Sequence, residues 1–189
     1  KDNVALILGD NFFYGQNLTA KLKDCAKLTN GAKVLLHSVS KPELYGVAKI
    51  NKNKKIIKIV EKPKKYISDY AVTGLYFFDN KVIKLAKALK PSKRGEIEII
   101  DLLNKYKTKN KLYADFIGRG GAWLDTGSIE DFYKTTSFVA AIEARQGLKI
   151  ACIEEIAYQN GWISKKQILN SVKFYGNCDF SKYLKKLIT

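Results

Sequence analysis

The sequence predicts an α/β fold, with a mixed and mainly parallel sheet, helices on both faces and a small C-terminal helical subdomain. An apolar run at residues 5–8 ends in Gly-Asp-Asn, as a buried parallel strand does where it meets its C-terminal loop. A helical pattern and a second strand pattern follow it and complete a strand–helix–strand unit. Residues 148–189 carry helical patterns alone. We therefore expect an α/β domain over residues 1–147 and a helical subdomain over residues 148–189.

The first helix is predicted from apolar side chains that recur at helical spacing between positions 18 and 26. Asn17 or Thr19 can cap its start. Asn30-Gly31 ends it before a strand at Ala32–Ser38, because glycine is favoured just beyond helix ends.

The middle of the chain alternates strand and helix patterns. Residues 47–50 and 56–60 flank a tip of Asn and Lys, which predicts an antiparallel hairpin. Tyr70–Phe78 is rich in β-branched and aromatic residues and predicts a strand. Beyond it, the patterns predict helices near residues 81–89 and 96–106, a strand at 112–117, a long helix from Ser128 to Gln146 with Gly147 as its stop, and helices near 165–171 and 179–187.

The composition is that of a globular protein. The 189 residues are 46% hydrophobic, and no apolar run approaches the roughly 20 residues needed to span a bilayer. The sequence start has no signal-peptide pattern. Cys25, Cys152 and Cys178 are widely spaced without a CxxC pattern, so neither a disulfide framework nor a zinc site is indicated. We expect a cytoplasmic protein without a membrane partner.

A net charge of +16 raises the alternative of a nucleic-acid partner. The residue types argue against it, because only three of the 34 basic residues are arginines, the side chain that base and phosphate recognition favours. The lysines are scattered over the surfaces of the expected helices and hairpin. This pattern favours a solvated, lysine-rich surface with weak attraction for anionic substrates over specific nucleic-acid binding.

Four short clusters combine residue types that carry chemistry. They are Leu-Gly-Asp-Asn at residues 8–11, Tyr-Gly-Val at 45–47 with Glu-Lys-Pro at 61–63, Arg-Gly-Glu-Ile-Glu at 94–98, and Trp-Leu-Asp-Thr-Gly at 123–127. Each has a structural alternative. Asp10 can bond its own backbone in a turn, and the residues around Asp125 can form a turn and a helix cap. Residues 61–63 can be a solvated strand end, and residues 94–98 the start of a charged helix.

Taken in order, these clusters and their neighbours resemble the glucose-1-phosphate thymidylyltransferase family, whose members catalyse the first step of the dTDP-rhamnose pathway. The further motifs are Tyr-Ala-Val-Thr-Gly-Leu-Tyr at residues 70–76, Pro-Ser-x-Arg-Gly-Glu-x-Glu-Ile at 91–99, Gly-Arg-Gly-x-Ala-Trp-Leu-Asp-Thr-Gly at 118–127 and Glu-x-Arg-Gln-Gly at 143–147. The resemblance covers essentially the whole chain and favours the thymidylyl branch of the sugar nucleotidylyltransferases. It implies a partial Rossmann-like sheet of the nucleotide-diphospho-sugar transferase type.

The resemblance implies a reaction in which a phosphate oxygen of glucose 1-phosphate attacks the α-phosphorus of dTTP and expels diphosphate. Such a site needs positioning and charge neutralisation rather than a nucleophile from the protein. Asp10 and Asp125 are expected to bind Mg²⁺, which prefers hard oxygen ligands and shares them with phosphate and water. Lys62 is the expected cation on the sugar phosphate. These three residues are the candidate catalytic residues.

The other substrate contacts also come from the resemblance. The expected substrate-binding set is Tyr45, Gly46, Glu61, Lys62, Val72, Arg94 and Glu98. Glu61 is expected to accept sugar hydroxyls, and the backbone of Gly46 and Val72, together with the Tyr45 side chain, is expected to shape the hexose pocket. Arg94 and Glu98 are expected to support the residues that contact the substrate.

Members of the family also have a second nucleotide-sugar site, at a subunit contact of a homo-oligomer that is a tetramer in the family. The resemblance assigns Tyr14, Gly15, Arg119 and Glu155 to this regulatory site. Gln159 stands where the family commonly has an arginine, and loss of a guanidinium weakens a diphosphate clamp. The alternative is that residues 154–159 are a loop into the helical subdomain.

One family feature has no counterpart in the sequence. The family opens with a glycine-rich loop of Gly-x-Gly-Thr-Arg-Leu-x-Pro type, which cradles the triphosphate. Without it, we expect a fragment that is inactive alone, holds the metal and sugar-phosphate half of the site, and exposes an apolar sheet edge. The alternatives are a sugar-1-phosphate nucleotidylyltransferase that uses UTP, CTP or ATP, and a non-catalytic sugar-phosphate-binding module.

Overall fold

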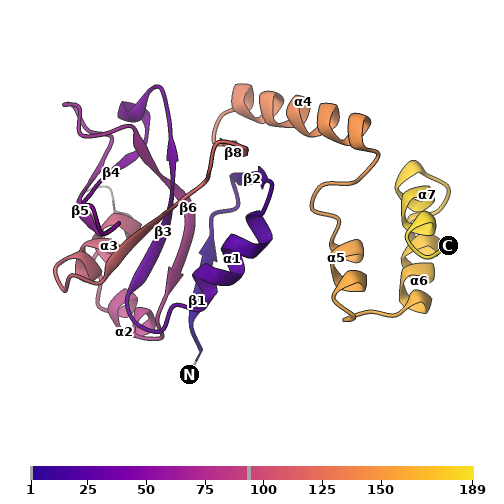
Figure 1. Cartoon of the computed structure of the whole chain (residues 1–189), viewed down its shortest axis with the longest axis horizontal. Helices are drawn as coiled ribbons and strands as arrows, with labels where there is room; N and C mark the ends of the chain where they lie inside the picture. The colour runs from indigo at the N-terminus through magenta and orange to yellow at the C-terminus, as the bar shows by residue number, and fades with distance from the viewer. Residues whose placement is uncertain (1, 93–94) are drawn as a thin grey trace. The chain divides into compact units, whose positions relative to one another are not determined.

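The computed structural model of the chain describes residues 2–92 and 95–189 (Figure 1). It contains two compact units: the first extends to Asp131, and the second runs from Phe132 to Thr189. All three cysteines are free, as the sequence predicts. Among the described helices, none combines the length and the apolar character that crossing a membrane requires.

The first unit is built on a six-stranded sheet in the order β5-β4-β6-β3-β7, with β1 pairing to β6. Its strands are β1 (Val4–Ile7), β3 (Ala32–Ser38), β4 (Gly46–Ile50), β5 (Ile56–Glu61), β6 (Tyr70–Phe78) and β7 (Leu112–Phe116). The sheet is mixed, as expected. Our expectation of mainly parallel pairing is wrong, because β6 runs antiparallel to β1, β3 and β4, and only the β3–β7 ladder is parallel in the described sheet. Apolar patterns report the burial of a strand but not its direction.

Strand β1 differs from the buried parallel strand that its apolar run predicts. It pairs antiparallel to β6, and within the described residues β6 is its only neighbour. Leu6 and Ile7 are therefore 38% and 56% exposed. The exposed apolar sheet edge that we expected lies here, along β1.

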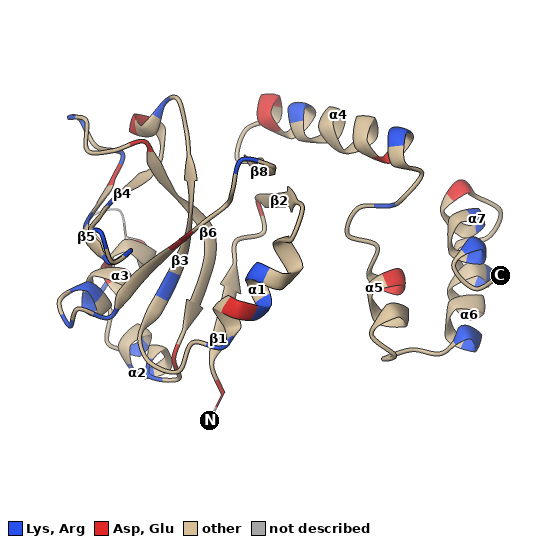
Figure 2. Ribbon diagram, in the orientation of Figure 1, with Lys and Arg blue, Asp and Glu red and all other residues tan. Residues whose placement is uncertain are grey.

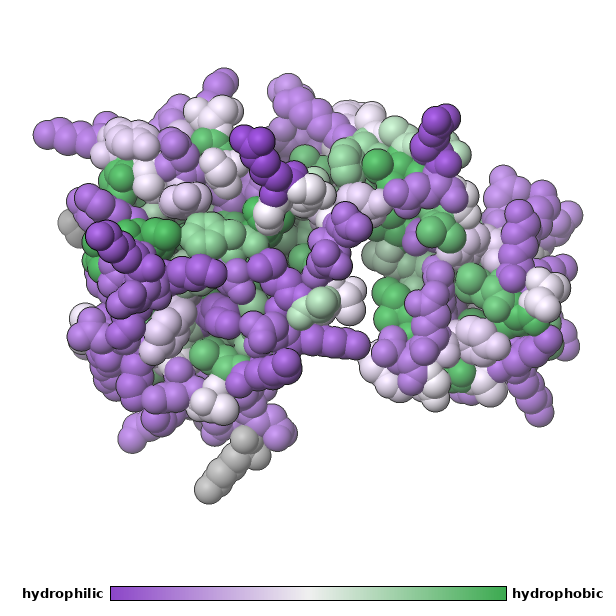
Figure 3. All heavy atoms as spheres, viewed as in Figure 1, coloured by the Kyte–Doolittle hydropathy of each residue, from purple (hydrophilic) through white to green (hydrophobic). Residues whose placement is uncertain are grey.

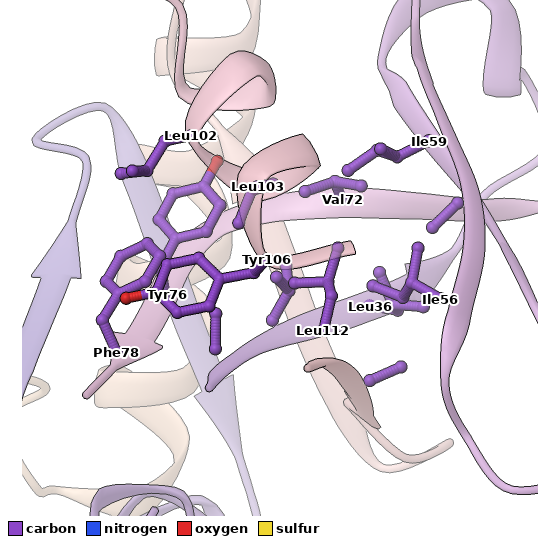
Figure 4. Close-up of a cluster of buried hydrophobic side chains, with 14 of the residues drawn as sticks. Leu36, Ile56, Ile59, Val72, Tyr76, Phe78, Leu102, Leu103, Tyr106 and Leu112 are labelled. Atoms are coloured by element: carbon purple, nitrogen blue, oxygen red, sulfur yellow. The ribbon is translucent and has the colours of Figure 1, made fainter. Parts of the chain in front are cut away.

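Helices cover both faces of the sheet, as predicted. On one face, α2 (Val82–Lys87) and α3 (Ile99–Lys107) enclose a core of aromatic and aliphatic side chains. Figure 4 shows the rings of Tyr76, Phe78 and Tyr106 gathered in this core. On the other face, α1 (Leu18–Ala26) buries Cys25 against Leu35 and the apolar side chains of β6. The alternation of β3 and β6 residues between the two cores is what a sheet covered on both sides requires.

Strand β2 (Asn11–Gly15) was not predicted from the sequence, which indicated a loop after residue 8. It pairs antiparallel with β8 (Gly121–Asp125) to form a separate two-stranded sheet. Its partner lies more than a hundred residues further along the chain. Such a pairing depends on tertiary structure and leaves little local pattern.

The helices of the second part of the chain are α4 (Ile129–Gln146), α5 (Ile153–Gln159), α6 (Lys165–Tyr175) and α7 (Asp179–Lys186). The expected start of α4 is confirmed by a hydrogen bond of 3.1 Å from Asp131 N to Ser128 Oγ. Gly147 follows its end with a positive φ of 69°. Helix α5 was not predicted, because its seven residues are shorter than the window of about 11–18 residues in which helical periodicity is recognised.

The side-chain cap that we expected at the start of α1 is not formed by Asn17. Asn17 occupies the N-cap position, but its backbone is left-handed and its side chain makes no capping hydrogen bond. In α6, by contrast, Ser164 and Gln167 form a reciprocal capping box. The core of the second unit lies between α6 and α7, with Ile168 and Leu184 fully buried.

Charged side chains are distributed over both units. Figure 2 shows Lys and Arg positions on most helices and on the β4–β5 hairpin, in separate places along the ribbon. The space-filling view in Figure 3 shows a surface that is largely hydrophilic, with separate apolar areas. This distribution agrees with the solvated lysine surface expected from the sequence.

Candidate active site

A cavity of about 260 Å³ in the first unit contains most of the residues singled out from the sequence. Its predicted members are Asp10, Tyr45, Gly46, Glu61, Lys62, Val72, Glu98 and Asp125. Arg94, the remaining member of the expected set, lies outside the described residues. The lining comes from strands of both sheets, from the turns beside them and from the start of α3. Residues that are far apart in the sequence therefore converge on one hollow.

Asp10 and Asp125 are brought together by the β2–β8 pair. Asn11, which follows Asp10, is the register partner of Asp125. Thr126, next to Asp125, binds the backbone of Asp10: its backbone N donates to Asp10 O at 2.7 Å, and its Oγ1 donates to the same oxygen at 2.9 Å. The backbone positions that carry the two carboxylates are consequently held next to each other at one end of this strand pair.

Each carboxylate already has one oxygen engaged. Asn11 Nδ2 donates to Asp10 Oδ1 at 2.8 Å, and Gly127 N donates to Asp125 Oδ1 at 2.9 Å. The hydrogen bonds that described residues make to these two carboxylates all involve Oδ1. Oδ2 of each side chain is left for another ligand.

Glu61 and Lys62 stand where the β4–β5 hairpin opens. Glu61 pairs in register with Gly46 at the end of β5. Lys62 has a positive φ of 41°, a conformation that costs a non-glycine residue on the order of 1 kcal/mol. A hydrogen bond of 3.0 Å from Lys62 N to Tyr45 O holds this turn. In the part of the chain that the structure describes, the exposed Lys62 ammonium has no ion-pair partner, so it is available to an anion.

Gly46 keeps the floor of the cavity open. A Cβ placed on it would lie 2.9 Å from Glu61 Oε2 and 3.8 Å from the Cβ of Val72. Tyr45 forms the adjoining wall, with its ring edge-on to Trp123 at a centroid distance of 5.1 Å. A side chain at position 46 would therefore occupy space beside the Glu61 carboxylate.

Carboxylates lie on one side of the cavity, close enough to Tyr76 to affect its hydroxyl. Burial, followed by the negative charges of Glu61 and Asp10, raises the pKa of the Tyr76 phenol. Glu98 accepts a hydrogen bond of 3.0 Å from Ser92 Oγ at the approach to α3. Negative charges on this side favour a cation near the carboxylates, while Lys62 supplies a positive charge at the hairpin.

The carboxylate pair suits a hard divalent cation. Among the described residues there is no group of three or more His, Cys, Asp or Glu side chains that could hold a metal. Two carboxylates suffice for Mg²⁺, which usually takes one or two protein carboxylates and completes its octahedron with phosphate and water oxygens. The oxygen-only donor set therefore fits a cation that is shared with a phosphorylated ligand.

Several residues of the site had no role in the predictions from sequence. Those that make hydrogen bonds there are Asn11, Gly74, Trp123 and Thr126, which line the cavity or hold its walls. Each belongs to a motif already recognised in the sequence. For Asn11, Trp123 and Thr126 the available signal was a position beside Asp10 or Asp125, and for Gly74 it was the motif at residues 70–76. Their contacts depend on the folded chain.

The residues expected at a regulatory site are divided between the units. Tyr14 and Gly15 line a second cavity of about 230 Å³, and Arg119 lies in the exposed bend beside it. Glu155 belongs to α5 of the second unit, where Gln159 Nε2 donates to it at 2.9 Å and the Tyr183 hydroxyl also bonds it. Burial and this hydrogen bond raise the pKa of Tyr183 to about 12.

A mixed sheet with a carboxylate pair and a lysine around one cavity is compatible with a nucleotidyl transferase. Residues 1–142 match the nucleotidyl transferase family, and the chain belongs to this family. Among its relatives is a glucose-1-phosphate thymidylyltransferase of Neisseria meningitidis, which is 46% identical over 187 residues. That match covers 99% of this chain and 65% of the relative, so the chain spans about two thirds of the relative's length.

Solved structures agree with this assignment. A glucose-1-phosphate thymidylyltransferase from Bacillus anthracis is 42% identical and superposes with a TM-score of 0.63 over 72% of this chain and 54% of that one. A UDP-glucose pyrophosphorylase structure, 24% identical, shares the fold with a TM-score of 0.62 over 72% of this chain and 55% of its own. The nucleotide-sugar transferase fold is thus common to all three.

Proposed function

We propose that this chain provides the metal and sugar-phosphate side of a glucose-1-phosphate thymidylyltransferase, which converts dTTP and glucose 1-phosphate into dTDP-glucose and diphosphate. The observation that carries the proposal is the gathering of Asp10, Asp125, Glu61 and Lys62 around one cavity of about 260 Å³. A hexose phosphate needs acceptors for its hydroxyls and a cation for its phosphate, and both are present there. The 46% identity to the Neisseria meningitidis enzyme supports the choice of substrates.

In this proposal the protein positions the reactants and neutralises their charge. Lys62 binds the sugar phosphate through its ammonium, and Glu61 accepts hydrogen bonds from the sugar hydroxyls. A phosphate oxygen of the sugar then attacks the α-phosphorus in line; a new P–O bond forms while the bond to diphosphate breaks. Asp10 and Asp125 would hold Mg²⁺, which when bound neutralises charge on the phosphates.

The 189 residues contain no Gly-x-Gly-Thr-Arg stretch, the kind of loop that binds the triphosphate in the family. The chain is accordingly proposed to bind glucose 1-phosphate with Mg²⁺ and to release no diphosphate by itself. Isothermal titration with glucose 1-phosphate tests this, with glucose as the control without a phosphate. Binding that requires the phosphate and is lost in Asp10→Asn supports the proposal; equal binding of glucose contradicts it.

Choice of base is tested on a chain that includes a nucleotide-binding loop. Diphosphate release from dTTP should exceed that from UTP, CTP or ATP at equal concentration. A preference for another nucleotide would identify a different sugar-1-phosphate nucleotidylyltransferase. Release from none would leave a sugar-phosphate-binding module.

The proposal extends to regulation and assembly in the cytoplasm. Tyr14, Gly15, Arg119 and Glu155 are proposed to contribute to a second nucleotide-sugar site in a homo-oligomer, with Gln159 weakening the diphosphate clamp. The cavity beside Tyr14 and Gly15 supports this site. Light scattering tests the assembly, and isothermal titration with dTDP-glucose tests the second site: the mass of a single chain, or no binding of dTDP-glucose, would contradict the proposal.

A further inference from the structure

We infer that Asn11 is a positioning residue that orients the Asp10 carboxylate for a divalent cation, and this inference rests on the function proposed for the cavity. Asn11 begins β2 directly after Asp10 and is half-buried. Its side-chain nitrogen donates to Asp10 Oδ1 at 2.8 Å. Asp10 itself is exposed, so this bond is the described restraint on its carboxylate.

Two donors fix the Asn11 amide in one orientation. Gly74 N donates to Asn11 Oδ1 at 2.9 Å, and Trp123 Nε1 donates to the same oxygen at 2.6 Å. A backbone N–H and an indole N–H can only donate, so the amide must present its oxygen to them. In the flipped orientation, the NH₂ group of Asn11 would face the N–H groups of Gly74 and Trp123, and no hydrogen bond could form between these donors. The nitrogen therefore faces Asp10 whether or not a ligand is present.

Both donors lie in strands: Gly74 in β6 and Trp123 in β8. Gly74 lies within β6, and a Cβ at this position would fall 2.6 Å from Asn11 Cγ. The site thus admits the Asn11 side chain because residue 74 has none of its own. Trp123 is only 9% exposed in β8 and packs edge-on against Tyr45. Asn11 consequently links the central sheet, the β2–β8 pair and one candidate metal ligand.

Asn11 acts on Asp10 and not on the second carboxylate. Asp125 Oδ1 has its own donor, Gly127 N, at 2.9 Å. Loss of the Asn11 amide would free the Asp10 carboxylate to rotate while leaving that bond intact. Removing a group that orients a metal ligand typically weakens metal binding by about 10- to 100-fold. We expect the lower end of this range, because only one of two ligands is affected.

The test is a titration of the chain with Mn²⁺ in the presence of glucose 1-phosphate, followed by electron paramagnetic resonance. Asn11→Ala should weaken Mn²⁺ binding about tenfold. Trp123→Phe, which removes one of the two fixing donors and keeps the ring, should weaken it by a smaller factor. The matched control is Asn80→Ala, which removes another long-range amide donor, from Asn80 Nδ2 to Asp2 O at 2.8 Å, outside the cavity. It should leave Mn²⁺ binding unchanged.

A spectroscopic readout separates orientation from general loss of structure. The chain has two tryptophans, Trp123 and Trp162, and the second is 73% exposed. In Asn11→Ala the indole N–H resonance of Trp123 should shift and lose its protection from exchange, while that of Trp162 stays in place. A fold that is merely weakened would instead broaden many resonances.

The outcomes distinguish this inference from the function on which it rests. Unchanged Mn²⁺ affinity in Asn11→Ala and Trp123→Phe, together with a loss in Asp10→Asn, would overturn the role of Asn11 alone. A loss in Asn80→Ala as large as that in Asn11→Ala would also overturn it. Absence of Mn²⁺ binding by the unaltered chain, or indifference to Asp10→Asn, would refute the metal pair itself and the positioning role with it.

Discussion

Replacing Gly46 by alanine should separate ligand binding from stability at the candidate site. The new methyl carbon would lie 2.9 Å from Glu61 Oε2, 3.6 Å from Ile100 Cδ1 and 3.8 Å from Val72 Cβ. Only the first distance is too short, and the atom concerned is the tip of an exposed, flexible side chain. Glu61 can turn away at little cost to the fold, but it then leaves the place where a sugar hydroxyl would meet it.

The two effects have different sizes. Glycine within a strand costs about 0.5–1 kcal/mol relative to alanine, so Gly46→Ala should leave the free energy of unfolding unchanged or raise it by about 0.5 kcal/mol. Loss of one hydrogen bond to a charged acceptor costs about 1.5–3 kcal/mol. At 1.4 kcal/mol per factor of ten, the affinity for glucose 1-phosphate should fall roughly 10- to 100-fold.

Urea unfolding and isothermal titration measure these two quantities on the same preparation. Gly118→Ala is the matched control, since a Cβ there meets nothing within 4 Å and the residue lines the second cavity, beside Tyr14, and not the cavity that Gly46 lines. An affinity for glucose 1-phosphate equal to that of the unaltered chain would refute the reasoning about Glu61. A loss of stability above about 2 kcal/mol would show that Glu61 cannot move aside.

Three further substitutions test charge and exposure. Lys62→Met should lower the affinity for glucose 1-phosphate roughly 10- to 100-fold in titration calorimetry and leave that for glucose unchanged; equal effects on both would contradict a phosphate contact. Burial raises the pKa of Asp115, but hydrogen bonds from Lys21 and Phe116 outweigh it and hold the pKa below its ordinary value. The stability that the Asp115 carboxylate contributes is complete above its unfolded pKa of about 3.9 and is lost as pH falls through the lower folded pKa. Asp115→Asn should therefore lower the free energy of unfolding, measured in urea, by about 1–2 kcal/mol at pH 7 and by less near pH 3. A deficit that is the same at both pH values would argue against this linkage. Ile7→Lys should reduce self-association of the chain in light scattering, because the residue is 56% exposed on the β1 edge; unchanged mass would mean that this edge does not drive association.

Much of the fold could be predicted because the signals were local. Strands β3 and β6 have the extents expected from their runs of apolar, β-branched and aromatic residues. The ends of α4 follow from Ser128 and Gly147, whose capping chemistry acts over a few residues. Strand direction and the exposure of β1 could not be derived in this way, because both depend on which strand lies alongside.

The candidate site shows the same division. Asp10 and Asp125 were singled out from the sequence, although each alone is compatible with a turn or a cap. Their proximity results from the β2–β8 pair, and β2 has no strong pattern of its own. The orientation of Asn11 was beyond prediction, because it is decided by one donor in β6 and one in β8.

The β2–β8 pair also sets the order in which the cavity can form during synthesis. Thr126, which grips the carbonyl of Asp10, follows it 116 residues later. At about 5–20 residues per second, a ribosome needs roughly 6–23 s to add that length. Through this interval the nascent chain carries one carboxylate of the pair without the other. A divalent cation that binds both carboxylates would therefore stabilise only the completed first unit. Its addition should raise the thermal midpoint of unfolding in proportion to the logarithm of its concentration.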